Sequence, residues 1–73
     1  MDPAEFLAQA YRHLEWCQGQ LQVPGARARI IRRARWVLGM IDRLPIDDSD
    51  EGLRLLLDGV REDFEAVLRA AGG

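Results

Sequence analysis

Few side chains in this sequence could act as a nucleophile or a base. His13 is the single histidine, Cys17 the single cysteine and Ser49 the single serine. His13 and Cys17 stand four positions apart, so the two share one face of a helix and could touch. A nucleophile and its base also need an orienting third group, and Glu15, the nearby acid, projects to another face. We therefore predict a protein that is not an enzyme.

Metal binding has equally little support in the sequence. A structural zinc site needs about four ligands, and the chain has no further His or Cys. The acidic segment 47–58 resembles a calcium loop in part, with Gly52 where such loops need glycine. Arg54, however, stands where an apolar side chain normally packs, and the last ligand would be Asp58 rather than a glutamate. Capping of a following helix explains these acids better, so we predict no metal and no cofactor.

Arginine is concentrated in one segment of the chain. All ten basic residues are arginines, and six of them lie within residues 26–43, which carry a net charge of +5. Residues 1–25 carry −2 and residues 44–73 carry −5, so the overall charge of −2 hides a strong segregation. Arginines in the first turns of a helix are unfavourable there, because that end is already positive. Arginines in this unfavourable position indicate one of two things. Either they pair with acids elsewhere in the fold, here those of residues 44–73, or they form a functional surface that binds anions.

The tryptophans accompany these arginines. On a helical wheel of about 100° per residue, Trp36 lies nearly opposite the apolar stripe of its helix. Trp16 likewise lies away from the apolar stripe of the first helix, beside Arg12. Tryptophan and arginine are enriched at the energetic centres of protein interfaces, although each indole could instead cover an edge of the fold. The predicted partner-binding residues are Trp36, Arg32, Arg33, Arg29, Met40, Arg43, Trp16 and Arg12.

These features favour a small adaptor, regulator or inhibitor that binds an acidic or mixed surface of another protein. A homodimer belongs to the same hypothesis, because a chain of 73 residues with two outward tryptophans could bury them against a second copy. We expect a cytoplasmic protein without membrane contact, since a lone cysteine forms no intrachain disulfide and neither a signal nor a membrane span is visible. The Arg-rich, Lys-free composition is typical of bacterial or phage genomes rich in GC.

A nucleic-acid-binding regulator is the alternative function. Five arginines lie within residues 27–35, where they could contact phosphates from one helix. The acidic residues 44–73 and an isoelectric point near 5.2 oppose this interpretation, because phosphate binding needs a positive field at the contact.

Three helices would position these residues. Asp2 and Pro3 form a helix start, Pro24 and Pro45 follow the first two helices, and apolar residues recur at spacings of three and four. The pattern predicts helices over about residues 3–22, 26–43 and 50–70. The apolar stripes are Leu7, Ala10, Leu14, Cys17 and Leu21, with Phe6 at the flank, in the first helix; Ile30, Ala34, Val37, Ile41 and Leu44 in the second; and Leu53, Leu57, Val60, Phe64, Val67 and Ala71 in the third. We predict an all-α fold with one domain over residues 1–73, an antiparallel three-helix bundle, with dimerisation into a larger bundle as an extension. On the third helix, a second strip opposite the main stripe is a candidate subunit contact: Leu55, Gly59, Ala66 and Ala70.

Overall fold

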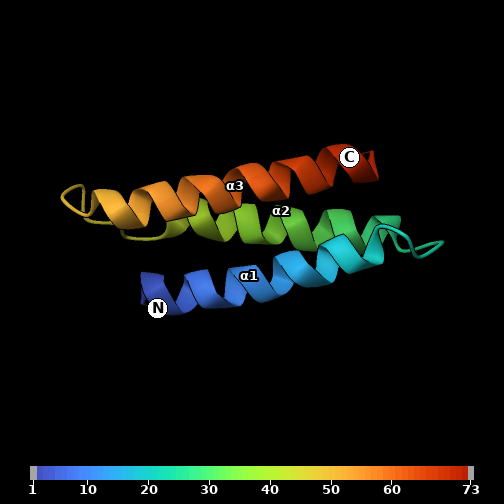
Figure 1. Cartoon of the computed structure of the whole chain (residues 1–73), viewed down its shortest axis with the longest axis horizontal. Coiled ribbons are helices and arrows are strands. Elements are labelled where there is room, and N and C mark those ends of the chain that lie inside the picture. The colour runs from blue at the N-terminus through green and yellow to red at the C-terminus, as the bar shows by residue number, and fades with distance from the viewer. Residues whose placement is uncertain (1, 73) are drawn as a thin grey trace.

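The computed structural model describes residues 2–72 and contains three helices in that range. They are α1 (Pro3–Gln20), α2 (Arg27–Arg43) and α3 (Glu51–Ala71). The helices run antiparallel in chain order, and each packs against the other two to form a bundle 42 Å long (Figure 1). This arrangement confirms the predicted all-α three-helix bundle. Met1 and Gly73, which the predicted domain includes, lie outside the described residues.

Local signals in the sequence set the helix starts. The Asp2 carboxylate accepts a hydrogen bond from the Ala4 amide at 3.3 Å, and Pro3 needs no donor partner at the first helical position. Asp50 caps α3 in the same way through the Leu53 amide. Residues 51–58 are helical, so they do not form a calcium loop. Asp50, in the same acidic segment, instead caps the start of α3.

The helix ends differ slightly from the predicted ones. α1 ends at Gln20 rather than near residue 22, because a turn over residues 21–25 precedes α2. Gly25 allows this turn, since its φ of +81° is unfavourable for a residue with a Cβ atom. Leu21, predicted to continue the apolar stripe of the first helix, is therefore exposed.

The core is built from the predicted apolar stripes. Its largest fully buried side chains are Phe64, Ile30, Leu57, Val37, Val60 and Cys17. Phe6, expected at the flank of the first stripe, is also buried. Among residues 2–72 no charged or polar residue is buried, so the charges lie on the outer faces of all three helices. In the same range, no helix has both the length and the apolar composition that a bilayer crossing requires.

Arg27 joins the start of α2 to the end of α3. Its Nε donates to the Ala71 carbonyl at 2.6 Å, and its Nη2 donates to the Gly72 carbonyl at 2.8 Å. The last carbonyls of a helix lack partners within the helix and form its negative end. The charge of Arg27 is thus unfavourable at the positive start of α2 but favourable at the negative end of α3. This tertiary contact accounts for one arginine of the basic segment.

Candidate functional site

An open groove lies between α1 and α2 on one side of the bundle. Its volume is about 610 Å³, within the roughly 300–1,000 Å³ usual for ligand sites. We call it the α1–α2 groove, and its lining residues are His13, Trp16, Arg29, Arg32, Arg33 and Trp36. The residues of α1 stand three positions apart, and those of α2 include Arg29, Arg33 and Trp36 at spacings of four and three. These residues therefore share one flank of each helix, the flank that borders the groove, whereas Arg32 lies at its rim.

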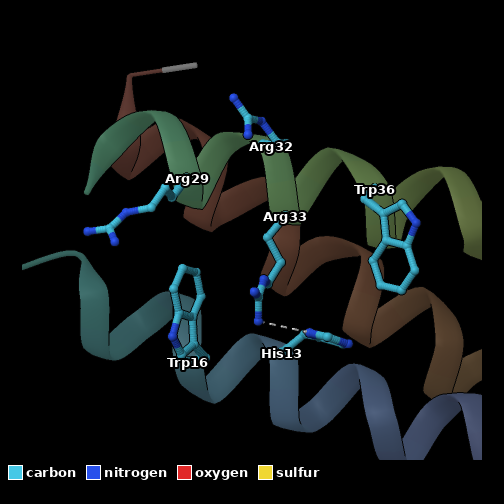
Figure 2. A pocket seen from close by; sticks show the side chains of 6 residues that line it. All are labelled: His13, Trp16, Arg29, Arg32, Arg33 and Trp36. Atoms are coloured by element: carbon cyan, nitrogen blue, oxygen red, sulfur yellow. Dashed lines mark hydrogen bonds between the residues drawn. The ribbon is translucent and has the colours of Figure 1, made fainter. Parts of the chain in front are cut away.

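Arg33 occupies the middle of the groove. Its side chain extends from α2 towards α1 and lies between the two indoles (Figure 2). The guanidinium carbon is 4.1 Å from the centre of the Trp16 ring, which is a cation–π contact. Its Nη1 lies 3.5 Å from His13 Nδ1, a long contact in which the guanidinium donates to a neutral imidazole. Arg33 therefore contacts both α1 residues of the groove.

Trp36 leans over the edge of α1 instead of projecting straight into solvent. Its ring centre lies 5.3 Å from that of His13, with an angle of 76° between the ring planes. This edge-on geometry is a favoured arrangement for aromatic pairs. The indole nevertheless remains 53% exposed. Trp36 is thus oriented by one contact and still presents about half of its surface to solvent.

The environment of His13 favours its neutral form. Partial burial lowers the pKa of His13 below its ordinary value of 6.5, and the positive charge of Arg33 lowers this pKa further. Cys17 faces the core and is fully buried. Burial raises the pKa of the Cys17 thiol, although Arg33 opposes this shift, so the thiolate is disfavoured. Cys17 therefore packs in the core, whereas His13, four residues before it on α1, lines the groove.

The groove retains positive charge that the chain itself does not neutralise. Within residues 2–72, the side chains of Arg29 and Arg32 take part in no hydrogen bond or salt bridge. The salt bridges of this range join Arg61 to Asp42 and Arg54 to Asp48, away from the groove. The acids of α3 therefore do not pair with the arginines of residues 27–35, which was one of the two open interpretations.

The predicted interface residues divide into two groups. Trp36, Trp16, Arg29, Arg32 and Arg33 line the groove together, with Arg32 pointing away from α1 at its rim (Figure 2). Trp16 was expected to face outward but is half-buried, because α2 and the Arg33 side chain cover it.

The other predicted residues lie outside this lining. Met40, which a helical wheel puts beside Trp36 on the outer face of the second helix, is half-buried in the structure and packs against the core. Arg43 and Arg12 are exposed.

His13 is the groove residue that sequence reasoning missed as a binding residue. From the sequence, His13 is weighed only as a partner of Cys17, either in catalysis or as a second zinc ligand. Its position three residues before Trp16 puts both on one flank of α1, and that spacing was the available signal. Among the described residues, no three His, Cys, Asp or Glu side chains gather in a way that could hold a metal ion. Comparison of the chain with protein-family models, with curated proteins and with solved structures found no match.

Proposed function

We propose that this chain is a non-catalytic protein-interaction module whose α1–α2 groove binds an acidic segment of a partner protein. The observation that supports this proposal is the combination, in one open groove, of an exposed indole with two guanidinium groups that have no partner in the described chain. Arginine binds carboxylates through two parallel hydrogen bonds, and interface centres are rich in tryptophan and arginine.

Each part of the groove has a separate role in this proposal. The exposed face of Trp36 takes an apolar side chain of the partner. Arg29 and Arg32, which both precede Trp36 on α2, take carboxylates that lie to one side of that apolar anchor. Arg33 is already engaged with Trp16 and His13, so it keeps the groove preorganised and reduces the entropy lost on binding.

A non-catalytic role fits the chemistry of the same residues. The Cys17 thiol is buried with a raised pKa, and His13 faces an arginine rather than an acid that could orient it. We propose the cytoplasm as the setting, because a single buried thiol fits a reducing compartment.

Selection from a random peptide display library tests this proposal. Wild type is compared with a groove variant, Arg29→Gln with Arg32→Gln, and with Trp36→Ala. Arg35→Gln is the matched control, because Arg35 is exposed on α2 outside the groove lining. Wild type and control should enrich acidic peptides that carry an apolar anchor. The variants should bind those peptides about tenfold or more weakly, the effect of losing about 1.4 kcal/mol. Enrichment of the same peptides by all four proteins would refute the proposal.

Single-stranded nucleic acid is the second candidate ligand. Its bases stack on aromatic side chains and its phosphates bind arginine, and the groove offers both groups side by side. The net charge of −2 and the acidic α3 weaken the long-range attraction that such binding uses. Fluorescence anisotropy with a labelled oligonucleotide, titrated at low and at high salt, separates the two candidates. Salt-dependent binding that the groove variant loses would favour nucleic acid.

A further inference from the structure

The outward side of α3 carries, among residues 2–72, the large apolar residue with the highest exposed fraction. Leu55 is 72% exposed, more than any other large apolar residue in residues 2–72. Glu51 lies four residues before Leu55, Asp58 lies three residues after it and Glu62 lies seven residues after it. At these spacings the three acids surround Leu55 on the same face of the helix. All three acids are exposed. We call these four residues the α3 acidic face.

We propose that the α3 acidic face of one copy of this chain occupies the α1–α2 groove of a second copy. This inference rests on the function proposed above and names one partner for it. The α3 acidic face has the composition that the groove calls for: one apolar anchor with three carboxylates around it. Arg54 also borders Leu55, but its guanidinium pairs with Asp48 at 3.6 Å, so the three carboxylates give this face its net negative charge. An amphipathic helix lying in a groove is a recurrent mode of protein recognition.

The charges of the two surfaces are complementary. Residues 26–43, which include α2, carry +5, and residues 44–73, which include α3, carry −5. Arg29 and Arg32 have no acidic partner within the described chain. Contact between copies pairs these arginines with Glu51, Asp58 or Glu62 and brings Leu55 against the exposed indole. Opposite charges across an interface fix its register and speed its formation.

The two surfaces of one copy cannot meet each other. α3 packs on α1 and α2 through Leu57, Val60 and Phe64, which are buried, so Leu55 and Glu62 point away from both helices. The groove lies between α1 and α2, on a different side of the bundle. The contact therefore forms only between copies, and it joins two unlike surfaces.

A complementation experiment by analytical ultracentrifugation tests this inference. The groove variant is Arg29→Gln with Arg32→Gln, and the face variant is Leu55→Gln with Glu62→Gln. All four positions are exposed and the new side chains suit a helix, so the fold is retained and circular dichroism verifies it. Neutral substitutions avoid an artificial attraction between the variants. Leu56→Gln is the matched control, because Leu56 is 50% exposed on α3 but lies outside the α3 acidic face.

The expected results follow from the pairing of unlike surfaces. Wild type and Leu56→Gln should gain mass above the 8.3 kDa monomer as concentration rises, and high salt should reverse the gain. Each variant alone should remain at the monomer mass. An equal mixture of the two variants should recover a species of twice that mass, since one intact groove and one intact face remain.

Three results would overturn the inference: a wild type that stays monomeric, variants that still associate, or a mixture that does not recover the dimer. A monomeric wild type that still selects acidic peptides through the groove would refute self-association alone. A wild type that associates as described but selects no peptide would limit the groove to the second copy. Failure of the inference and failure of the broader function are thus distinguishable.

Discussion

Arg33 is the residue on which the shape of the groove depends most. It contacts Trp16 through its charge and His13 through a nitrogen, and His13 in turn contacts the edge of Trp36. The four side chains form one continuous row from α1 to α2. A cation–π contact at a partly exposed site is worth roughly 0.5–1 kcal/mol, so Arg33 stabilises the fold modestly while it orders the indoles.

The first prediction concerns the protonation of His13. Its pKa in the folded chain is lowered, so the unfolded chain binds more protons as pH falls through the ordinary value of 6.5. The contribution of neutral His13 is therefore fully present above 6.5 and is lost as pH falls through the lower folded value. The free energy of unfolding, measured with urea at several pH values, should fall on acidification more in wild type than in His13→Gln. Parallel pH profiles of the two proteins would contradict this.

A second prediction separates the two causes of that shift. Replacing Arg33 with Gln removes the positive charge beside the imidazole but leaves most of its burial. The pKa of His13, followed by NMR of its ring protons, should therefore rise towards its ordinary value in Arg33→Gln. Arg35→Gln serves as the control, since Arg35 lies outside the groove lining. An unchanged His13 pKa in Arg33→Gln would show that Arg33 does not act on this ring.

At the scale of the helices, Arg27 shows how one element stabilises another. Arg27→Gln should lower the free energy of unfolding by about 1 kcal/mol, because it removes a charged donor from the last carbonyls of α3. Urea unfolding of this variant is compared with that of Arg35→Gln, which removes the same charge from the same helix without a contact to α3. Equal losses in the two variants would argue against the role of Arg27.

Gly59 within α3 and Gly72 directly after it should respond to alanine in opposite directions. Gly72 ends the helix with a φ of +79°, and a Cβ atom there would lie 3.2 Å from Arg27 Nη2. Gly72→Ala should therefore destabilise the fold by about 1 kcal/mol. Gly59 lies within the helix with no atom near the position of a Cβ, so Gly59→Ala should stabilise the fold by about 0.5–1 kcal/mol. Thermal unfolding of both variants measures the two signs.

The helices were more predictable from the sequence than the groove between them. The buried side of α2 could be predicted because the spacing of apolar residues along one helix is visible in the sequence of that helix alone. The residues on that side are Ile30, Ala34, Val37 and Ile41. The contact of His13 with Trp36 depends instead on how α1 and α2 are rotated against each other. A helical wheel for α2 alone likewise puts Met40 on the outer face, whereas in the bundle Met40 packs against the core. The Arg27 contact was equally invisible, since its acceptors are backbone carbonyls.

At the scale of the whole molecule, positive charge is concentrated on α2 and negative charge on α3. The basic α2 and the acidic α3 lie side by side, joined by the Arg61–Asp42 salt bridge at 2.6 Å, while most other charges point outward. The small net charge of −2 therefore does not describe the surface that a partner meets. We expect binding through the α1–α2 groove to weaken with salt, because its arginines are solvent-exposed. Peptide affinity that is constant from low to high salt would contradict this expectation.

The two tryptophans allow the most direct test of the proposed function. Both line the α1–α2 groove and the chain contains no others, so NMR of the labelled protein gives two indole N–H signals that report on this site. The titrant is the acidic peptide that the display selection enriches most. Both indole signals should shift and reach saturation with it, and Arg29→Gln with Arg32→Gln should need about tenfold or more peptide to reach the same shifts. A peptide that binds while both indole signals stay in place would contradict the groove as the binding site.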